Sequence, residues 1–183
     1  MKVLGISGSL RRDSHNTRLL RAAGALLPPG AELEVWEDLK AVPPYDADDD
    51  ASAPRPHVLR ALADAVAEAD VVLFATPEYN HSLPGQLKNA LDWLSRPLAT
   101  SPLRGKPVAV VGASTGLFGA VWAQAELRKV LGAIGARVID RELPVGLADD
   151  AFVDDGRLAD PDQELALADL LAELVGEVDA VAV

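Results

Sequence analysis

The chain has 183 residues, of which 49% are hydrophobic and 25% are charged, a composition that is typical of globular proteins and excludes a disordered one. This length predicts a single domain over residues 1–183. The net charge of −11 argues against nucleic-acid or anionic-membrane partners, because both require a cationic surface. Cysteine is absent, which excludes disulfides, thiolate zinc sites and cysteine nucleophiles.

The charge is unevenly distributed along the chain. Residues 1–30 contain five basic side chains and one acidic side chain, a net charge of +4, so that residues 31–183 carry −15. A cationic segment in an anionic protein predicts that an anion binds near residue 11. The N-terminus enters an apolar strand without signal-peptide features, and no apolar run approaches the ~20 residues of a membrane helix. We therefore expect a cytoplasmic protein.

Short apolar runs alternate with longer segments of helical periodicity, which predicts an α/β fold with a parallel sheet. The predicted elements, in chain order, are strand 3–7, helix 17–27, strand 33–36, helix 57–69, strand 71–75, helix 84–95, strand 108–111, helix 119–134, strand 137–139 and helix 162–178.

The polarity of each predicted strand indicates its place in the sheet. Runs 3–6, 71–75 and 108–111 are apolar throughout, as expected of strands that are covered on both faces. Residues 32–35 alternate between polar and apolar, and residues 137–140 are polar at both ends, which is typical of edge strands. The pattern predicts a doubly wound five-stranded parallel sheet of order 2-1-3-4-5, with ligands bound at loops 8–16, 76–84 and 112–119.

The first of these loops has the residues of a phosphate site. It enters a helix whose unpaired N–H groups and positive dipole end favour an anion. The alternative is an ordinary capped helix start with surface arginines. A dinucleotide fingerprint would need glycine where Ser7 and Leu10 stand, and no P-loop Gly-Lys-Ser/Thr occurs. The candidate phosphate ligands are Ser9, Arg11, Ser14, Asn16 and Thr17.

The second and third loops offer groups that suit a flat ligand. Two prolines stiffen the second loop, which includes the candidate residues Pro77, Glu78, Tyr79 and Asn80. The third loop is rich in glycine, so its backbone could approach a planar ring closely, although a simple turn would have the same composition. Its candidate residues are Ser114, Thr115 and Gly116.

Two motifs give the chain a resemblance to a known family. Gly8-Ser9-Leu10-Arg11 is followed by Ser14-x-Asn16-Thr17, and residues 77–93 read Pro-Glu-Tyr-Asn-His-Ser-x-Pro-Gly-x-Leu-Lys-Asn-Ala-x-Asp-Trp. The chain thereby resembles the NAD(P)H-dependent FMN reductases over residues 2–140, a flavodoxin-like family that includes quinone, chromate and azo-dye reductases. One departure is Ala120-Val121-Trp122, where members often carry glycine or arginine.

The resemblance implies a flavodoxin-like fold, bound FMN and NADPH or NADH as transient electron donor. The first loop would hold the FMN phosphate, and the second and third loops would flank its ring. Two electrons would pass to a small acceptor such as a quinone, free flavin, azo compound or metal oxyanion, with no obligatory catalytic side chain. The resemblance also implies a homodimer or a dimer of dimers. Trp93 and Trp122 lie on the interface helices, although ordinary core packing is the alternative for each.

Three other interpretations are open at this stage. A flavodoxin-type carrier would bind FMN without its own reductase activity, and a flavin-free module would have kept only the fold. His81 would either lie near the ring or stabilise its loop. The acidic residues 46–50 suggest a metal site, but Ala51 and His57 stand where an EF-hand needs glycine and glutamate. We therefore expect no metal there, and a solvated loop.

Overall fold

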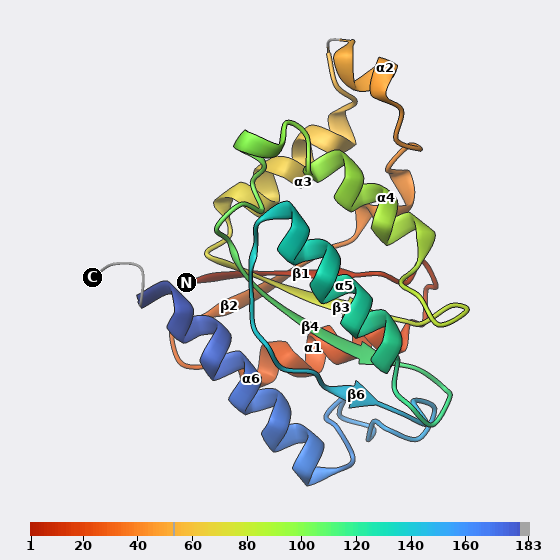
Figure 1. Cartoon of the computed structure of the whole chain (residues 1–183). Coiled ribbons are helices and arrows are strands. Elements are labelled where there is room, and N and C mark those ends of the chain that lie inside the picture. Colours follow the sequence, from red (N-terminus) through yellow and green to blue (C-terminus); the bar gives the residue numbers. More distant parts are fainter. Residues whose placement is uncertain (53, 180–183) are drawn as a thin grey trace.

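The structure, a computed structural model, describes residues 1–52 and 54–179. Its centre is a parallel sheet in the order β2-β1-β3-β4-β5 (Figure 1), so the predicted 2-1-3-4-5 order and the flavodoxin-like class are confirmed. The central strands are buried along nearly their whole length because helices cover both of their faces. The four longer strands are β1 (Lys2–Ser7), β2 (Glu32–Trp36), β3 (Val71–Thr76) and β4 (Pro107–Ala113).

The far edge of the sheet differs from the prediction of one strand over residues 137–139. Two short strands, β5 (Arg137–Val138) and β6 (Pro144–Val145), both pair in parallel with β4, and the sheet therefore has six strands. β5 lies beside the start of β4, and β6 lies beside its end. A two-residue strand is too short to show periodicity, so the sequence pattern did not indicate β6.

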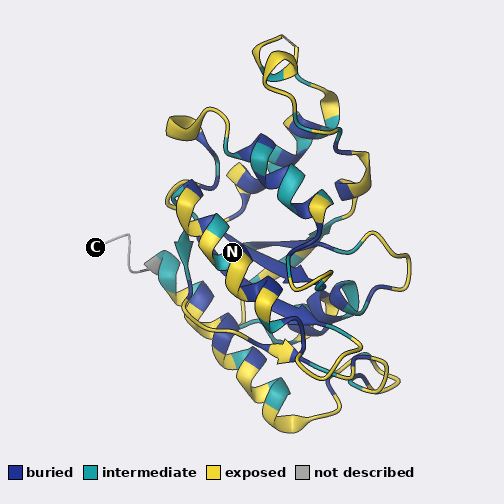
Figure 2. Ribbon diagram, turned by 45° about the vertical axis from the view of Figure 1, so that its right-hand side comes forward, coloured by how far each residue is buried: buried dark blue, intermediate teal, exposed yellow. Residues whose placement is uncertain are grey.

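Two layers of helices enclose the sheet (Figure 1). α1 (His15–Leu26) and α6 (Pro161–Asp179) pack on one face, and their leucines form a core with Val71, Leu73 and Val111. The opposite face carries the second core, in which Leu4, Phe74 and Val110 meet three helices. Figure 2 shows the result, with buried strands between helices that expose only their outer sides. The three helices on this second face are α3 (His57–Glu68), α4 (Gly85–Leu94) and α5 (Val121–Ile134).

Three short helical segments complete the fold: η1 (Asp38–Ala41), α2 (Ala47–Ala51) and η2 (Leu98–Thr100). The acidic segment that we expected to be a loop forms α2, because the Asp46 side chain accepts a hydrogen bond from the Asp48 N–H (2.7 Å) and caps it. Among the residues described, no helix combines the length and apolar character needed to cross a membrane.

Candidate functional site

Three loops meet where the parallel strands end, because the carboxyl ends of β1, β3 and β4 lie at the same edge of the sheet. Between them lies a hollow of about 100 Å³. The predicted Thr17, Asn80 and Gly116 are not part of its lining. The other nine predicted residues line it together with His15 and Ala113: Ser9, Arg11, Ser14, Asn16, Pro77, Glu78, Tyr79, Ser114 and Thr115. We call this space the cofactor hollow.

The first loop is packed tightly against the second. The Gly8 N–H donates to the Ala75 carbonyl (2.8 Å), and a Cβ at Gly8 would lie 2.9 Å from Leu87 Cδ2 and 3.3 Å from Pro77 Cδ. A larger residue at position 8 would therefore have to displace the end of the Leu87 side chain on α4 and press on the Pro77 ring. Beyond this contact the chain turns outward, and the exposed guanidinium of Arg11 donates, among the described residues, only to the Asp13 carbonyl (3.3 Å).

The N-terminus of α1 lies at the cofactor hollow, and the helix has no acidic residue in its own first turn. Ser14 is the N-cap, and its Oγ accepts a hydrogen bond from the Thr17 N–H (3.2 Å). No acidic residue lies in the first turn, so the positive end of the helix dipole is available to an anion. The Thr17 hydroxyl does not line the cofactor hollow; it donates a hydrogen bond to Ser7 Oγ (3.1 Å).

Asn16 joins the first loop to the end of β4. Its Nδ2 donates to the Ala113 carbonyl (2.9 Å), and its Oδ1 accepts from the Ala113 N–H (2.9 Å). The side chain is buried, and both of its polar ends are used in this bridge. The amide of Asn16 therefore holds the cofactor hollow in shape, and its expected contact with a phosphate stays a prediction.

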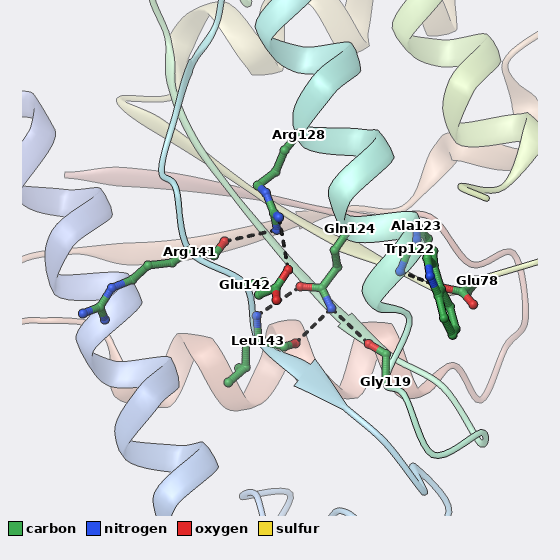
Figure 3. Close-up of polar contacts among 9 residues, drawn as sticks. All are labelled: Glu78, Gly119, Trp122, Ala123, Gln124, Arg128, Arg141, Glu142 and Leu143. Carbon is green, nitrogen blue, oxygen red and sulfur yellow. Dashed lines mark hydrogen bonds and ion pairs between the residues drawn. The ribbon is translucent and has the colours of Figure 1, made fainter. Parts of the chain in front are cut away.

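The second loop is anchored by Glu78. The α5 N-cap, Ala120, has a left-handed backbone and no side chain that can cap the helix. Glu78 Oε2 instead accepts from the N–H groups of Trp122 (3.0 Å) and Ala123 (3.1 Å) (Figure 3). The other carboxylate oxygen lies 3.7 Å from His81 Nδ1. Glu78 thus fixes the loop to α5, in addition to lining the cofactor hollow.

The tip of the second loop is a tight turn that leaves its tyrosine exposed. Tyr79 and Ser82 exchange two backbone hydrogen bonds (3.0 and 3.2 Å), and Asn80 and His81 between them have φ values of 54° and 61°. The Tyr79 ring is 51% exposed beside the cofactor hollow. His81 packs edge-on against Trp122, with ring centroids 4.8 Å apart, whereas Trp93 is buried and donates from Nε1 to the Pro43 carbonyl (2.9 Å).

The third loop packs against the segment that contains β6. Gly119 has a φ of +56°, and a Cβ there would lie 2.4 Å from the Pro144 carbonyl carbon. The buried Gln124 donates to the carbonyls of Gly119 (3.0 Å) and Leu143 (3.3 Å) and accepts from the Leu143 N–H (3.1 Å) (Figure 3). Gly119 therefore serves packing within the chain. Gly116 has open space on its Cβ side, where the nearest atom is Ser114 Oγ at 3.7 Å.

The structure adds His15 to the residues of the cofactor hollow. Its Nε2 lies 3.1 Å from Asp149 Oδ1, whereas its Nδ1 is buried without a hydrogen-bond partner among the described residues. Its place as the first residue of α1, inside the phosphate-loop motif, is the signal that would have identified it.

The chemistry of these groups fits the phosphate end of a flavin nucleotide. Hydroxyls, a guanidinium and a helix N-terminus converge on a small space, which matches the acceptor oxygens of a phosphate dianion. Tyr79 provides a flat ring at the rim. Ligand pockets usually enclose about 300–1,000 Å³, so a hollow of about 100 Å³ has room for a phosphate group but not for a whole flavin nucleotide.

Comparison with known proteins shows the family of the chain. The model of a family described as NADPH-dependent FMN reductase matches residues 1–150, and an NAD(P)H-dependent FMN reductase of Pseudomonas aeruginosa is 45% identical over 161 residues, 87% of this chain and 85% of the relative. The chain belongs to the NADPH-dependent FMN reductase family. The chain is therefore an NAD(P)H-dependent oxidoreductase with FMN as its cofactor.

Two further proteins resemble this chain. A quinone reductase of Escherichia coli K12 is 39% identical over 141 residues, 77% of this chain and 74% of the relative. The solved structure of FerB, a flavoenzyme NAD(P)H:(acceptor) oxidoreductase from Paracoccus denitrificans, has a TM-score of 0.84 and 33% sequence identity, covering 98% of this chain and 97% of that one.

Proposed function

We propose that the protein passes two electrons from NADPH or NADH through FMN to a small quinone. The observation that carries this proposal is the convergence of three loops on one hollow that opens beside the exposed Tyr79. A ring at this rim is reached from solvent on one side, so a nicotinamide and then an acceptor can use the same place. Relatives named as quinone reductases support this acceptor class.

The residues of the chain bind and orient the cofactor in this proposal. Bound FMN supplies the chemistry, accepting a hydride and then passing two electrons to the acceptor. Ser9, Arg11, Ser14 and the α1 N-terminus would hold the phosphate, while Asn16 and Thr17 keep the loop in shape. The other predicted residues lie around the ring, and none of them is assigned as an acid or base: Pro77, Glu78, Tyr79, Asn80, Ser114, Thr115 and Gly116.

The test begins with the absorption spectrum of the purified protein after FMN is added. NADPH and NADH oxidation is then measured with 1,4-benzoquinone, an azo dye, chromate and free FMN in parallel. We expect the quinone to give the highest kcat/KM, with parallel double-reciprocal lines because donor and acceptor share one place. A protein that binds no FMN, or that accumulates a one-electron reduced state and ignores quinones, would overturn the proposal.

We also propose that a second copy of this chain covers the flavin ring. The cofactor hollow is too small to enclose FMN. The second loop contacts Trp122 at the start of α5, and the exposed apolar side chains of these neighbouring segments form a group that we call the apolar rim. Phe118 and Trp122 are in edge contact there, with ring centroids 5.2 Å apart. The apolar rim consists of Tyr79, Leu117, Phe118 and Trp122, which are 51%, 70%, 61% and 43% exposed.

The oligomeric state tests this second proposal. We expect the holoenzyme to sediment as a dimer or a dimer of dimers, and Phe118→Glu to shift it toward monomer with weaker FMN binding, because a charge would be buried at the interface. Leu165→Glu is the matched control, since Leu165 is 62% exposed but lies on α6. A wild-type monomer at tens of micromolar, or equal effects of the two variants, would contradict it.

The cytoplasmic location and the single domain stay predictions from the sequence.

A further inference from the structure

A second hollow adjoins the cofactor hollow at the carboxyl ends of β1 and β2. It encloses about 370 Å³, and Ser9 and Arg11 line both spaces. Its opposite wall comes from the end of β2 and from η1. We call this space the basic hollow; it is lined by Ser7, Ser9, Leu10, Arg11, Arg12, Thr17, Arg21, Val35, Trp36, Glu37, Leu39 and Lys40.

Four of the five charged side chains that line the basic hollow are cationic. Arg12, Arg21 and Lys40 are exposed and make no ion pair with any residue in the described part of the chain. With Arg11 they face one carboxylate, that of Glu37, in a protein whose net charge is −11. Unpaired like charges that lie close together repel one another and so destabilise the folded protein. A bound anion would offset this repulsion.

Trp36 adds an aromatic surface to the same space. It is the last residue of β2 and lies in register with Ile6 of β1. The indole is half-buried, packing on the core of the second sheet face while also lining the basic hollow. A fixed aromatic ring among arginines suits a ligand with a flat base and a phosphate group, since the base can stack and the phosphate can accept charge-assisted hydrogen bonds.

We propose that the basic hollow binds the 2′-phosphoadenosine end of NADPH, with the adenine beside Trp36 and the 2′-phosphate among Arg12, Arg21 and Lys40. This inference rests on the proposed function. The shared wall of Ser9 and Arg11 gives the rest of the dinucleotide a path toward the flavin ring. NADH has no 2′-phosphate, so it cannot make the contacts with Arg12, Arg21 and Lys40, and it binds more weakly than NADPH.

The direct test is calorimetric titration of the FMN-loaded protein with adenosine 2′,5′-bisphosphate and, separately, with AMP. Loading with FMN keeps both probes out of the cofactor hollow. We expect the bisphosphate to bind at least tenfold more tightly than AMP. Arg21→Ala and Lys40→Ala should each weaken the bisphosphate about five- to tenfold, as expected for the loss of one charge-assisted contact, with AMP affinity unchanged.

Two further variants separate a binding role from a general change in charge. Lys129→Ala removes an exposed cation on α5, outside the basic hollow, and should leave both affinities unchanged. Glu37→Gln removes the opposing carboxylate and should tighten the bisphosphate several-fold. In steady state, Arg21→Ala should raise the KM for NADPH and leave the KM for NADH and both kcat values unchanged.

Equal affinities for the bisphosphate and AMP, or equal effects of Arg21→Ala and Lys129→Ala, would overturn the inference. The FMN absorbance and NADH oxidation of the same preparations show whether the proposed function holds. If the protein binds FMN and oxidises NADH but binds the bisphosphate no more tightly than AMP, the proposed function stands. Only the role of the basic hollow is then refuted.

Discussion

Arg11 is the charged side chain that lines both hollows. Its guanidinium is exposed and bonds only one backbone carbonyl within the described residues, so it is available to a ligand. In Arg11→Ala we expect FMN binding to weaken by ~1.5–3 kcal/mol through the loss of one charge-assisted contact, as measured by quenching of flavin fluorescence. Arg60→Ala, which removes an exposed arginine of α3, is the control, and an unchanged Kd in Arg11→Ala would refute our placement of the phosphate.

At the scale of single residues, the sequence indicates membership of the site better than it indicates roles. Nine of the twelve predicted residues line one hollow, because the end of a parallel strand is a place that a pattern can locate. The bridge from Asn16 to Ala113 spans 97 positions, and the bond from Glu78 to α5 spans 44. In both contacts the partner of the side chain is a backbone group, which every residue type has. Nothing in the local sequence pattern therefore indicates these contacts.

At the scale of elements, the start of α5 depends on a side chain from another loop. Because Ala120 offers no cap, Glu78→Ala leaves the Trp122 and Ala123 N–H groups without their acceptor and removes a charge from the positive end of the dipole. We expect the free energy of unfolding to fall by about 1–2 kcal/mol, as measured by urea denaturation of the apoprotein. Glu78→Gln keeps an acceptor and should lose about half as much; a loss of only a few tenths in Glu78→Ala would contradict the capping role.

The longer elements were largely predictable; the differences are α2, which forms where a loop was expected, the start of α1, and β6. Buried runs and apolar helix faces are continuous signals, and the corresponding strands and helices are all present. α1 begins two residues before the predicted start at position 17, because its cap is Ser14. β6 was not predicted because its two residues have no sequence pattern of their own. They are positioned by pairing with β4 and by the hydrogen bond between Gln124 and the neighbouring Leu143.

At the scale of the whole molecule, the cofactor hollow predicts that FMN stabilises the fold. A ligand that binds only the folded state adds about 2.7 kcal/mol at a concentration of 100 times its Kd, which corresponds to a rise in Tm of roughly 5–10 °C for a chain of this size. Scanning fluorimetry with and without FMN measures it. Riboflavin, which lacks the phosphate, should give a much smaller shift, and an equal shift would contradict a site built around phosphate.

The charge pattern of the whole chain was informative but coarse. The net +4 of residues 1–30 predicted an anion near residue 11, and three of these arginines do line the basic hollow. Arg18, by contrast, lies 4.6 Å from the centroid of the Phe152 ring. Lys40 and Trp36 come from a segment that the charge count did not mark. Only the pairing of β1 with β2 brings them to the same place.

The bridge between Asn16 and Ala113 also bears on the order in which the molecule is made. The first loop contains most of the predicted phosphate ligands, yet its shape depends on a backbone group at the end of β4. A ribosome must therefore extend the chain well past Ala113 before this loop can take its final form, although every phosphate ligand was synthesised long before. Because domains fold as units during synthesis, we expect flavin to be acquired late, by a nearly complete chain, and nascent N-terminal fragments to remain without it.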